Sequence, residues 1–236
     1  MKEYQTIEIK EENEPLIAIP PEFPRFEPHP YVLAGADYRG ISPWQLRQSV
    51  VNALQRAQAK LNQVKPGWKL YIFDAYRPNF IQQFMVDLEY LKVAKEENID
   101  PAKATAAQKE FLFTRVYRIL AIPSDDPKTP PPHSTGAAVD CTLMDEKGQE
   151  VFMGSPIDEN SNRSNPDYFT NSDDPAALHA NANRVLLNNV MASAGFRRNP
   201  TEWWHFSMGD QYAALLERRE NPQNKTIARY GRADLI

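Results

Sequence analysis

The sequence predicts a single α+β domain with a central, mostly antiparallel sheet flanked by helices. The chain has 236 residues, of which 42% are hydrophobic and 11% aromatic, so it can bury one substantial core. Apolar residues recur at helical spacing in several segments, and short strand-like segments lie between them. No internal repeat or linker divides the sequence. We therefore expect residues 1–236 to form one domain, with a cleft on the sheet as its functional site.

Residues 1–40 are predicted to follow the domain surface in extended form. They contain the proline-rich segments 19–24 and 28–31. Proline lacks the amide donor that a helix needs and restricts the residue before it, so a long helix is excluded here. Tyr31 and Tyr38 have side chains that could reach a cleft, but packing at an exposed rim is the favoured role for both.

A helix is predicted from Ser42-Pro43, a capping hydroxyl followed by proline at the first helical position, to about Val64. A buried strand over 69–73 follows and ends at the polar segment Asp74-Ala75-Tyr76-Arg77-Pro78. The inward stripe of the predicted helix consists of Leu46, Val50, Leu54, Ala57 and Leu61.

The second half of the chain alternates between predicted helices, strands and loops. Helices are expected over 79–96, over 100–120 with Asp100-Pro101 as its cap, and from Asp174-Pro175 to Gly195. A strand over 137–144 and a turn at 145–148 predict a hairpin with 151–153, and 154–173 reads as a long loop. Segments 196–197 and 203–208 are expected to close the sheet, before a polar tail over 221–236. The last helix should turn Leu178, Val185, Leu186, Val190 and Met191 inward.

The overall charge argues against several kinds of partner. The net charge of −4 and the isoelectric point near 5.7 argue against binding to a nucleic acid or an anionic membrane, which would require a basic surface.

The sequence also bears on the location of the protein. No apolar run reaches the length of a membrane span, and the acidic N-terminal segment lacks a signal-peptide core. We expect a cytoplasmic protein without an obligate protein partner. A periplasmic location is the alternative if a signal peptide has been removed.

One stretch concentrates reactive side chains, Pro132-His133-Ser134-Thr135-Gly136-Ala137-Ala138-Val139-Asp140. Gly136 permits a tight turn after His133. The strand alternation then places Asp140 on one face of the predicted strand, with Cys141 on the other. A carboxylate in an otherwise apolar strand is costly to bury, and either a cation or a buried arginine would offset that cost. The spacing alone leaves these two open.

A second stretch, Glu202-Trp203-Trp204-His205, supplies another imidazole and another carboxylate. Positions three apart on a strand face opposite ways, so both groups serve one site only if Glu202 lies in the turn before the strand. The preceding Asn199-Pro200-Thr201 favours such a turn. In the alternative interpretation, the two tryptophans are core residues and their polar neighbours lie at the rim.

Together the two stretches predict a zinc-dependent hydrolase with one zinc ion per chain. Two histidines and one aspartate, His133, Asp140 and His205, suffice for a catalytic zinc that keeps its fourth position for water. Glu202 would remain free to take the proton of that water. Cys141 is the one cysteine of the sequence, so an internal disulfide is excluded. We expect Cys141 to be a buried structural thiol.

These motifs resemble those of the VanX-type D-alanyl-D-alanine dipeptidases, within the wider group of zinc D,D-peptidases. The match includes His133 to Asp140, Glu202 to His205, Asp74-Ala-Tyr-Arg77-Pro78, and Met153-Gly-Ser-Pro-Ile-Asp158. The four motifs occur in the family's order between Ser42 and His205. Two positions depart from the family pattern: Pro131 stands where serine is usual, and Ile157 replaces phenylalanine. The Ser-His-His sequence common after the last aspartate is also missing.

The resemblance implies a role for each matched residue. His133, Asp140 and His205 would bind zinc, and Glu202 would act as general base and acid. Arg77, which spacing alone would assign to a structural salt bridge, would stabilise the tetrahedral intermediate. Asp158 would hold the ammonium group of a small dipeptide substrate such as D-Ala-D-Ala.

Two other functions are compatible with the same motifs. One is a D,D-carboxypeptidase or endopeptidase that acts on peptidoglycan stem peptides, which would require an open cleft and export. The other is a zinc-containing binding domain without catalysis, although such a domain would not need Glu202 and Arg77.

Overall fold

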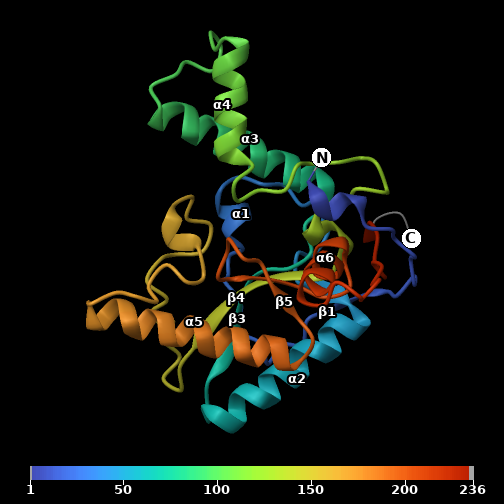
Figure 1. Cartoon of the computed structure of the whole chain (residues 1–236), viewed down its shortest axis with the longest axis vertical. Coiled ribbons are helices and arrows are strands. Elements are labelled where there is room, and N and C mark those ends of the chain that lie inside the picture. Colours follow the sequence, from blue (N-terminus) through green and yellow to red (C-terminus); the bar gives the residue numbers. More distant parts are fainter. Residues whose placement is uncertain (1, 234–236) are drawn as a thin grey trace.

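Four antiparallel strands in the order β3-β4-β6-β5 form the central sheet of the computed structural model, which describes residues 2–233 (Figure 1). A second sheet pairs β1 with β2. This arrangement confirms the predicted α+β fold with an antiparallel sheet flanked by helices. The strands are β1 (Leu16–Ala18), β2 (Gln45–Arg47), β3 (Lys69–Asp74), β4 (Ala138–Met144), β5 (Arg197–Arg198) and β6 (His205–Ser207).

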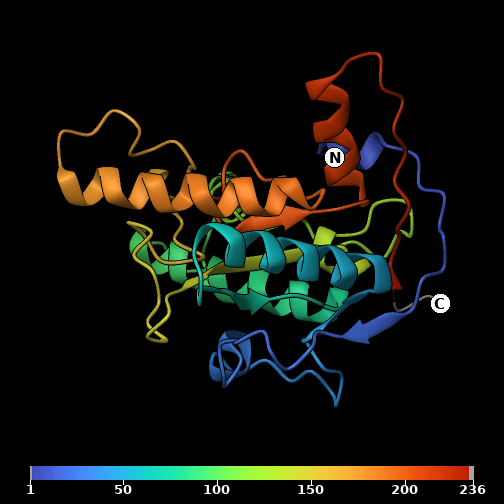
Figure 2. The same cartoon turned by 90° about the horizontal axis from the view of Figure 1, so that it is seen from below.

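The helices lie around the central sheet. α2 and α5 run side by side along it (Figure 2), whereas α3 and α4 form a hairpin that projects from the body (Figure 1). The α-helices are α1 (Pro30–Leu33), α2 (Gln48–Val64), α3 (Asn79–Glu96), α4 (Ala106–Val116), α5 (Pro175–Ser193) and α6 (Gln211–Glu220), and the short 3-10 helices are η1 (Glu3–Thr6), η2 (Pro132–Thr135) and η3 (Asn162–Ser164).

The two faces of the sheet carry different kinds of side chain, because side chains alternate between the faces along each strand. On β4, Val139, Cys141 and Leu143 belong to the main hydrophobic core, which also contains the inward residues of α2 and α5. Asp140 and Thr142 lie on the opposite face and are also buried. One face therefore carries the core, and the other is free to carry polar chemistry.

The first long helix begins six residues later than Ser42, where the sequence predicted its start. Residues 45–47 form β2 instead, and Leu46 pairs with Ile17 of β1. The tertiary ladder between these two strands outweighs the local capping signal at Ser42-Pro43. The end of the helix at Val64 and the buried stripe agree with the prediction, except that Leu46 belongs to the strand.

Two other helix predictions need correction. The helix expected from Asp100 is α4, and its cap is Thr105, whose side chain accepts from the amide of Gln108. On α5, Val190 and Met191 are buried as predicted, but Leu178 and Val185 are 44% and 45% exposed, so this part of the predicted inward face is wrong. The buried residues of α5 are Ala177, Ala180, Asn183, Arg184, Leu187, Val190 and Met191.

The regions near the two ends of the chain also differ from expectation. Helix α6, capped by Asp210, was not predicted. In the middle of the chain, the predicted hairpin turn forms, with an antiparallel bridge between Met144 and Glu150 and a hydrogen bond from Val151 to the carbonyl of Leu143, but 151–153 itself forms no strand. Within the predicted polar tail 221–236, Tyr230 is fully buried, and residues 234–236 lie outside the described part. Tyr31 and Tyr38, expected at an exposed rim, are buried.

Arg47 fixes the loop that precedes β4. Its guanidinium is fully buried and donates to the carbonyl oxygens of Glu14, Thr135 and Gly231. Its backbone amide donates to the carbonyl of Gly136 at 2.8 Å. One side chain thus ties together the N-terminal segment, the loop with His133 and the C-terminal segment. Within residues 2–233, no helix is both long and apolar enough to cross a membrane.

Gly136 generates a stability prediction because its backbone is left-handed, with φ of 71°, and a Cβ atom there would clash with the side chain of Leu16. Gly148 has a similar φ of 77° but no atom within 4 Å of a Cβ at that position, so Gly148→Ala is a matched control. We expect Gly148→Ala to cost about 1–2 kcal/mol through backbone strain alone. Gly136→Ala should cost about 1–3 kcal/mol more because of the clash. Urea unfolding followed by tryptophan fluorescence measures both, and equal losses would contradict the role of Leu16.

Candidate metal centre and catalytic site

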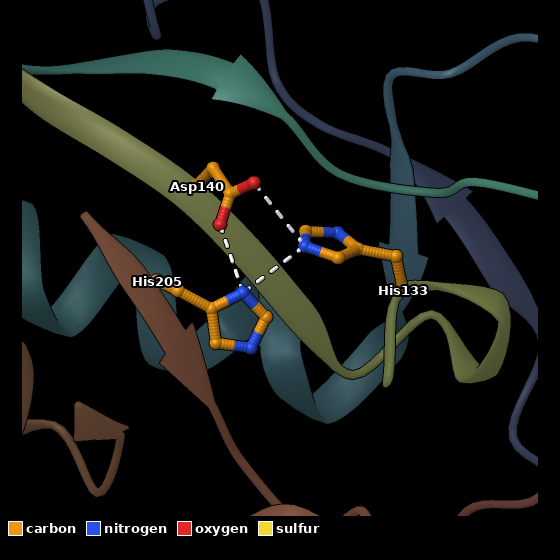
Figure 3. A group of neighbouring side chains, drawn as sticks. All are labelled: His133, Asp140 and His205. Atoms are coloured by element: carbon orange, nitrogen blue, oxygen red, sulfur yellow. Dashed lines mark hydrogen bonds and ion pairs between the residues drawn. The ribbon is translucent and has the colours of Figure 1, made fainter. Parts of the chain in front are cut away.

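His133 of η2, Asp140 of β4 and His205 of β6 meet at one point on the polar face of the sheet (Figure 3). His205 Nδ1 lies 2.9 Å from Asp140 Oδ1 and 3.1 Å from His133 Nε2. His133 Nε2 lies 3.2 Å from Asp140 Oδ2. All three side chains are buried. The structure therefore brings together the three predicted metal ligands.

Local structure explains how these residues converge. Asp140 lies directly opposite His205 in the ladder between β4 and β6, so the two side chains share a face. His133 reaches the same point because the chain reverses at Gly136 between η2 and β4. The loop with His133 is in turn held against β2 by Arg47.

Neighbouring groups orient both imidazole rings. His133 Nδ1 lies 2.8 Å from the carbonyl oxygen of Ala75, which can only accept, so Nδ1 carries a hydrogen and Nε2 faces the centre. His205 Nε2 lies 3.2 Å from the hydroxyl of Ser207, which itself donates to Asp210 at 2.9 Å. The Ser207 oxygen thus accepts from Nε2, and His205 Nδ1 faces the centre. Such outer contacts are typical of metal-binding histidines.

Two ring nitrogens and a carboxylate that face one another require a positive charge between them. Burial alone would raise the pKa of Asp140, but the imidazoles of His133 and His205 bring it well below the usual range. Burial would lower the pKa of His133, but Asp140 raises it above the ordinary value. A metal ion bound between them would supply this charge.

The donor set fits zinc. Imidazole nitrogens and a carboxylate oxygen are common zinc ligands, and bond lengths of about 2.0–2.1 Å place tetrahedral ligands roughly 3.3 Å apart. The separations of 2.9–3.2 Å between the three ligand atoms are close to this value. Three protein ligands leave a fourth position for water.

Glu202 lies in the turn before β6, where the sequence placed it. Its Oε2 atom is 3.9 Å from His205 Nδ1, and its side chain is buried. Burial raises the pKa of Glu202 to about 7, and the carboxylates of Asp140 and Asp158 act in the same direction. A buried carboxyl group beside a candidate metal site is a suitable proton acceptor.

Arg77 is both a salt-bridge partner and a site residue. Its Nε donates to Asp74 at 2.9 Å, and its two terminal nitrogens donate to Gln82 at 2.9 Å and to the Tyr31 hydroxyl at 2.6 Å. It also lies 3.7 Å from Asp140 Oδ2. The buried arginine and the cation site, which spacing left as alternatives for Asp140, are therefore both present. The guanidinium is held rigidly before any ligand binds.

Tyr31 is a site residue that the sequence analysis assigned to the rim. Its hydroxyl accepts from Arg77 and donates to Asp158 Oδ2 at 3.0 Å. His29 positions Tyr31 by capping α1, and on its other side His29 bonds Asp74 at 3.1 Å. The proline-rich composition of 28–31 led the sequence analysis to an extended surface segment and not to this role for Tyr31. The one local indication of helix α1 was His29 as a capping residue followed by proline at the first helical position.

Asp158 lies in the long loop after β4, with a left-handed φ of 63°. Burial raises the pKa of Asp158 to about 6, and the Asp140 carboxylate adds to this effect. Arg184 of α5 holds the loop by donating to the carbonyl oxygens of Met153 at 2.7 Å and Asn165 at 3.0 Å. The buried guanidinium of Arg184 thereby fixes both sides of the segment that carries Asp158.

All six predicted site residues line a single cavity of about 120 Å³, which is smaller than the pockets that hold drug-sized ligands, typically about 300–1,000 Å³. They are Arg77, His133, Asp140, Asp158, Glu202 and His205.

The other two histidines lie outside the metal centre: His29 bonds Asp74, and His179 is exposed on α5. Cys141 is buried on the core face, as predicted.

A buried His-Asp-His centre beside a carboxyl group and a fixed arginine is the arrangement expected of a metallopeptidase. The family model for D-Ala-D-Ala dipeptidase matches residues 25–225. A relative from Synechocystis sp., named D-alanyl-D-alanine dipeptidase, is 44% identical over 99% of this chain and 98% of its own length. The chain belongs to the D-Ala-D-Ala dipeptidase family.

More distant similarities extend to other bacteria. A D-alanyl-D-alanine dipeptidase of Enterococcus faecalis is 29% identical over 67% of this chain and 71% of its own length. Among solved structures, the LdcB LD-carboxypeptidase matches 90% of this chain and 76% of its own, with a TM-score of 0.46 and 16% identity. The D,D-pentapeptidase VanY, in complex with Zn(II), matches 89% and 95%, with a TM-score of 0.46 and 14% identity.

The contacts of His205 generate a prediction for metal affinity. Ser207→Ala removes the acceptor that orients the ring, so we expect zinc affinity to fall by about ten- to a hundredfold while the fold is kept. Competition with a chromophoric chelator measures the affinity, and circular dichroism monitors the fold. Ser193→Ala is the control, because that hydroxyl bonds only within α5. Unchanged affinity in Ser207→Ala would show that Ser207 does not orient His205.

Proposed function

We propose that this chain is a zinc-dependent dipeptidase that hydrolyses D-Ala-D-Ala or a similar short D-containing dipeptide. The observation that carries the proposal is the convergence of the His133-Asp140-His205 centre, Glu202 and Arg77 on one small cavity. The relative from Synechocystis sp., which matches over nearly the full length, supports the choice of substrate class.

In this proposal His133, Asp140 and His205 hold one zinc ion. Bound zinc would lower the pKa of a water molecule toward neutrality and polarise the carbonyl group of the substrate. The contacts of Ala75 with His133 and of Ser207 with His205 keep both rings in the orientation that binding needs.

Glu202 moves the protons of the reaction. Its carboxylate takes a proton from the attacking water, and the resulting acid gives that proton to the leaving amine as the peptide bond breaks. Its burial supports this double role, because burial disfavours the charged form and so makes the carboxylate a better proton acceptor. With Glu202 buried in the cavity wall, bulk water does not compete for the proton.

Arg77 stabilises the negative charge that develops on the carbonyl oxygen. Its contacts with Asp74, Gln82 and Tyr31 fix the guanidinium in advance, so little reorganisation accompanies the reaction. A planar, permanently charged group suits an oxyanion better than a mobile lysine does.

Asp158 binds the free ammonium group of the substrate. It lines the cavity, and the Tyr31 hydroxyl holds its carboxylate. A carboxylate at this place recognises a dipeptide, since a longer peptide has no charged amine at the same distance from the scissile bond. The small cavity volume and this carboxylate favour a dipeptidase over a carboxypeptidase that acts on stem peptides.

The test is hydrolysis of D-Ala-D-Ala and of N-acetyl-D-Ala-D-Ala by the zinc-loaded protein, with released D-alanine as the readout. We expect the acetylated substrate to be cut at least about tenfold more slowly, because it lacks the charge that Asp158 binds. Asp158→Asn should slow only the free dipeptide. Equal cleavage of both substrates would indicate a carboxypeptidase, and cleavage of neither by the zinc-loaded protein would refute the proposed function.

Replacement of the proposed base separates catalysis from metal binding. Glu202→Gln should keep zinc and the fold but reduce kcat by about a hundred- to ten-thousandfold, because the amide cannot accept the proton. Steady-state kinetics and metal analysis of the same sample provide the comparison, with the exposed Glu110→Gln as control. Retained turnover in Glu202→Gln would remove Glu202 from its role.

A further inference from the structure

Two side chains of the N-terminal segment, Lys2 and Tyr4, line the same cavity as the metal centre. η1, which contains Tyr4, packs against α6. In both views this segment lies away from the 154–173 loop, which is on the other side of the molecule (Figures 1 and 2). The proposed mechanism uses neither Lys2 nor Tyr4.

Lys2 carries a partly buried positive charge with a donor to spare. Its ammonium donates to the carbonyl oxygens of Tyr117 at 3.0 Å and Leu120 at 3.2 Å, just beyond the end of α4. An ammonium has three donors, so one remains for a ligand. No carboxylate of residues 2–233 lies within 4.0 Å of this nitrogen, although Glu202 is near enough to act on its pKa. A partly buried cation without a close counterion loses some of its hydration, and an anionic ligand would offset that loss.

Tyr4 carries an unused polar group beside the same cavity. Its side chain is 4% exposed, and its hydroxyl has no hydrogen-bond partner within the described part of the chain. The ring packs edge-on against Tyr212 at 5.4 Å, which fixes its orientation. Burial raises the pKa of Tyr4, so the hydroxyl stays protonated and can donate. A buried hydroxyl without a partner is uncommon in a folded protein unless a ligand or water completes it.

An ammonium and a hydroxyl in one cavity wall are the donor pair expected for a carboxylate. A dipeptide has one carboxylate, at the opposite end from its ammonium group. Lys2 and Tyr4 belong to the N-terminal segment, whereas Asp158 belongs to the 154–173 loop and is held by the Tyr31 hydroxyl. Different segments of the cavity wall therefore supply the donor pair and the carboxylate that the two ends of a dipeptide need.

We propose that Lys2 and Tyr4 form the subsite that binds the C-terminal carboxylate of the substrate. This inference rests on the proposed function, because it assigns one end of the same substrate. Arg118 is the competing cation in the cavity wall, but its side chain is exposed and bound to Asn160 at 2.8 Å. The subsite makes the enzyme selective for substrates with a free carboxylate.

The experiment compares D-Ala-D-Ala with D-alanyl-D-alaninamide, which lacks the carboxylate charge, on the zinc-loaded full chain. Wild type should prefer the free carboxylate by about ten- to a hundredfold in kcat/KM. Lys2→Met should remove most of this preference, by slowing cleavage of the free dipeptide while changing cleavage of the amide less than about threefold. Tyr4→Phe should act in the same direction with a smaller effect. Lys10→Met and Tyr168→Phe, at exposed positions, are the matched controls.

Equal losses on both substrates in Lys2→Met would overturn the proposal, since Lys2 would then act through Glu202 or the fold. A preference removed by Arg118→Gln instead would also overturn it. If wild type cleaves neither dipeptide, the proposed function fails, and calorimetric binding of the two dipeptides then tests the subsite separately. Tighter binding of D-Ala-D-Ala than of its amide in wild type but not in Lys2→Met would support it, and equal binding in wild type would refute it.

Discussion

The pairing of β4 with β6 is the constraint on which the site depends. It places Asp140 opposite His205, with both side chains on the face away from the core. A shift of one residue would turn Asp140 into the core and bring Cys141 to the polar face. The hydrophobic residues that alternate with Asp140, among them Val139 and Leu143, therefore also determine where the metal ligands point. The same strand register therefore determines both the packing of the core and the geometry of the centre.

Two polar networks support the centre from opposite sides. On one side, Asp74 joins His29 and Arg77, and Arg77 continues to Tyr31. On the other, Ser207 and Asp210 hold His205. Because buried polar groups without partners are costly, each network keeps its members in one arrangement. These contacts hold the candidate metal ligands and Arg77 in place, and the unpaired hydroxyl of Tyr4 lines the same cavity.

The sequence predicted well what local structure determines. The strand at Lys69, the helix from Asn79 and the turn that presents Glu202 each follow from neighbouring residues, and the structure contains all three. The prediction failed where distant segments decide the outcome. The start of α2 depends on pairing with β1, and the burial of Tyr31 depends on Arg77, 46 residues away. The contacts of Lys2 with the end of α4 had no local signal at all.

The contacts of Arg47 bear on the order in which the protein can be completed during synthesis. Its guanidinium donates to the carbonyl oxygens of Glu14, Thr135 and Gly231, and Thr135 lies in the loop with His133. Gly231 is synthesised almost a hundred residues after Thr135. The contacts that clamp this loop are therefore complete only when Gly231 has joined them. A ribosome-bound chain that has just exposed His205 holds all three candidate metal ligands but lacks this last contact. The nascent protein therefore has its candidate ligand set before the loop with His133 is fully clamped.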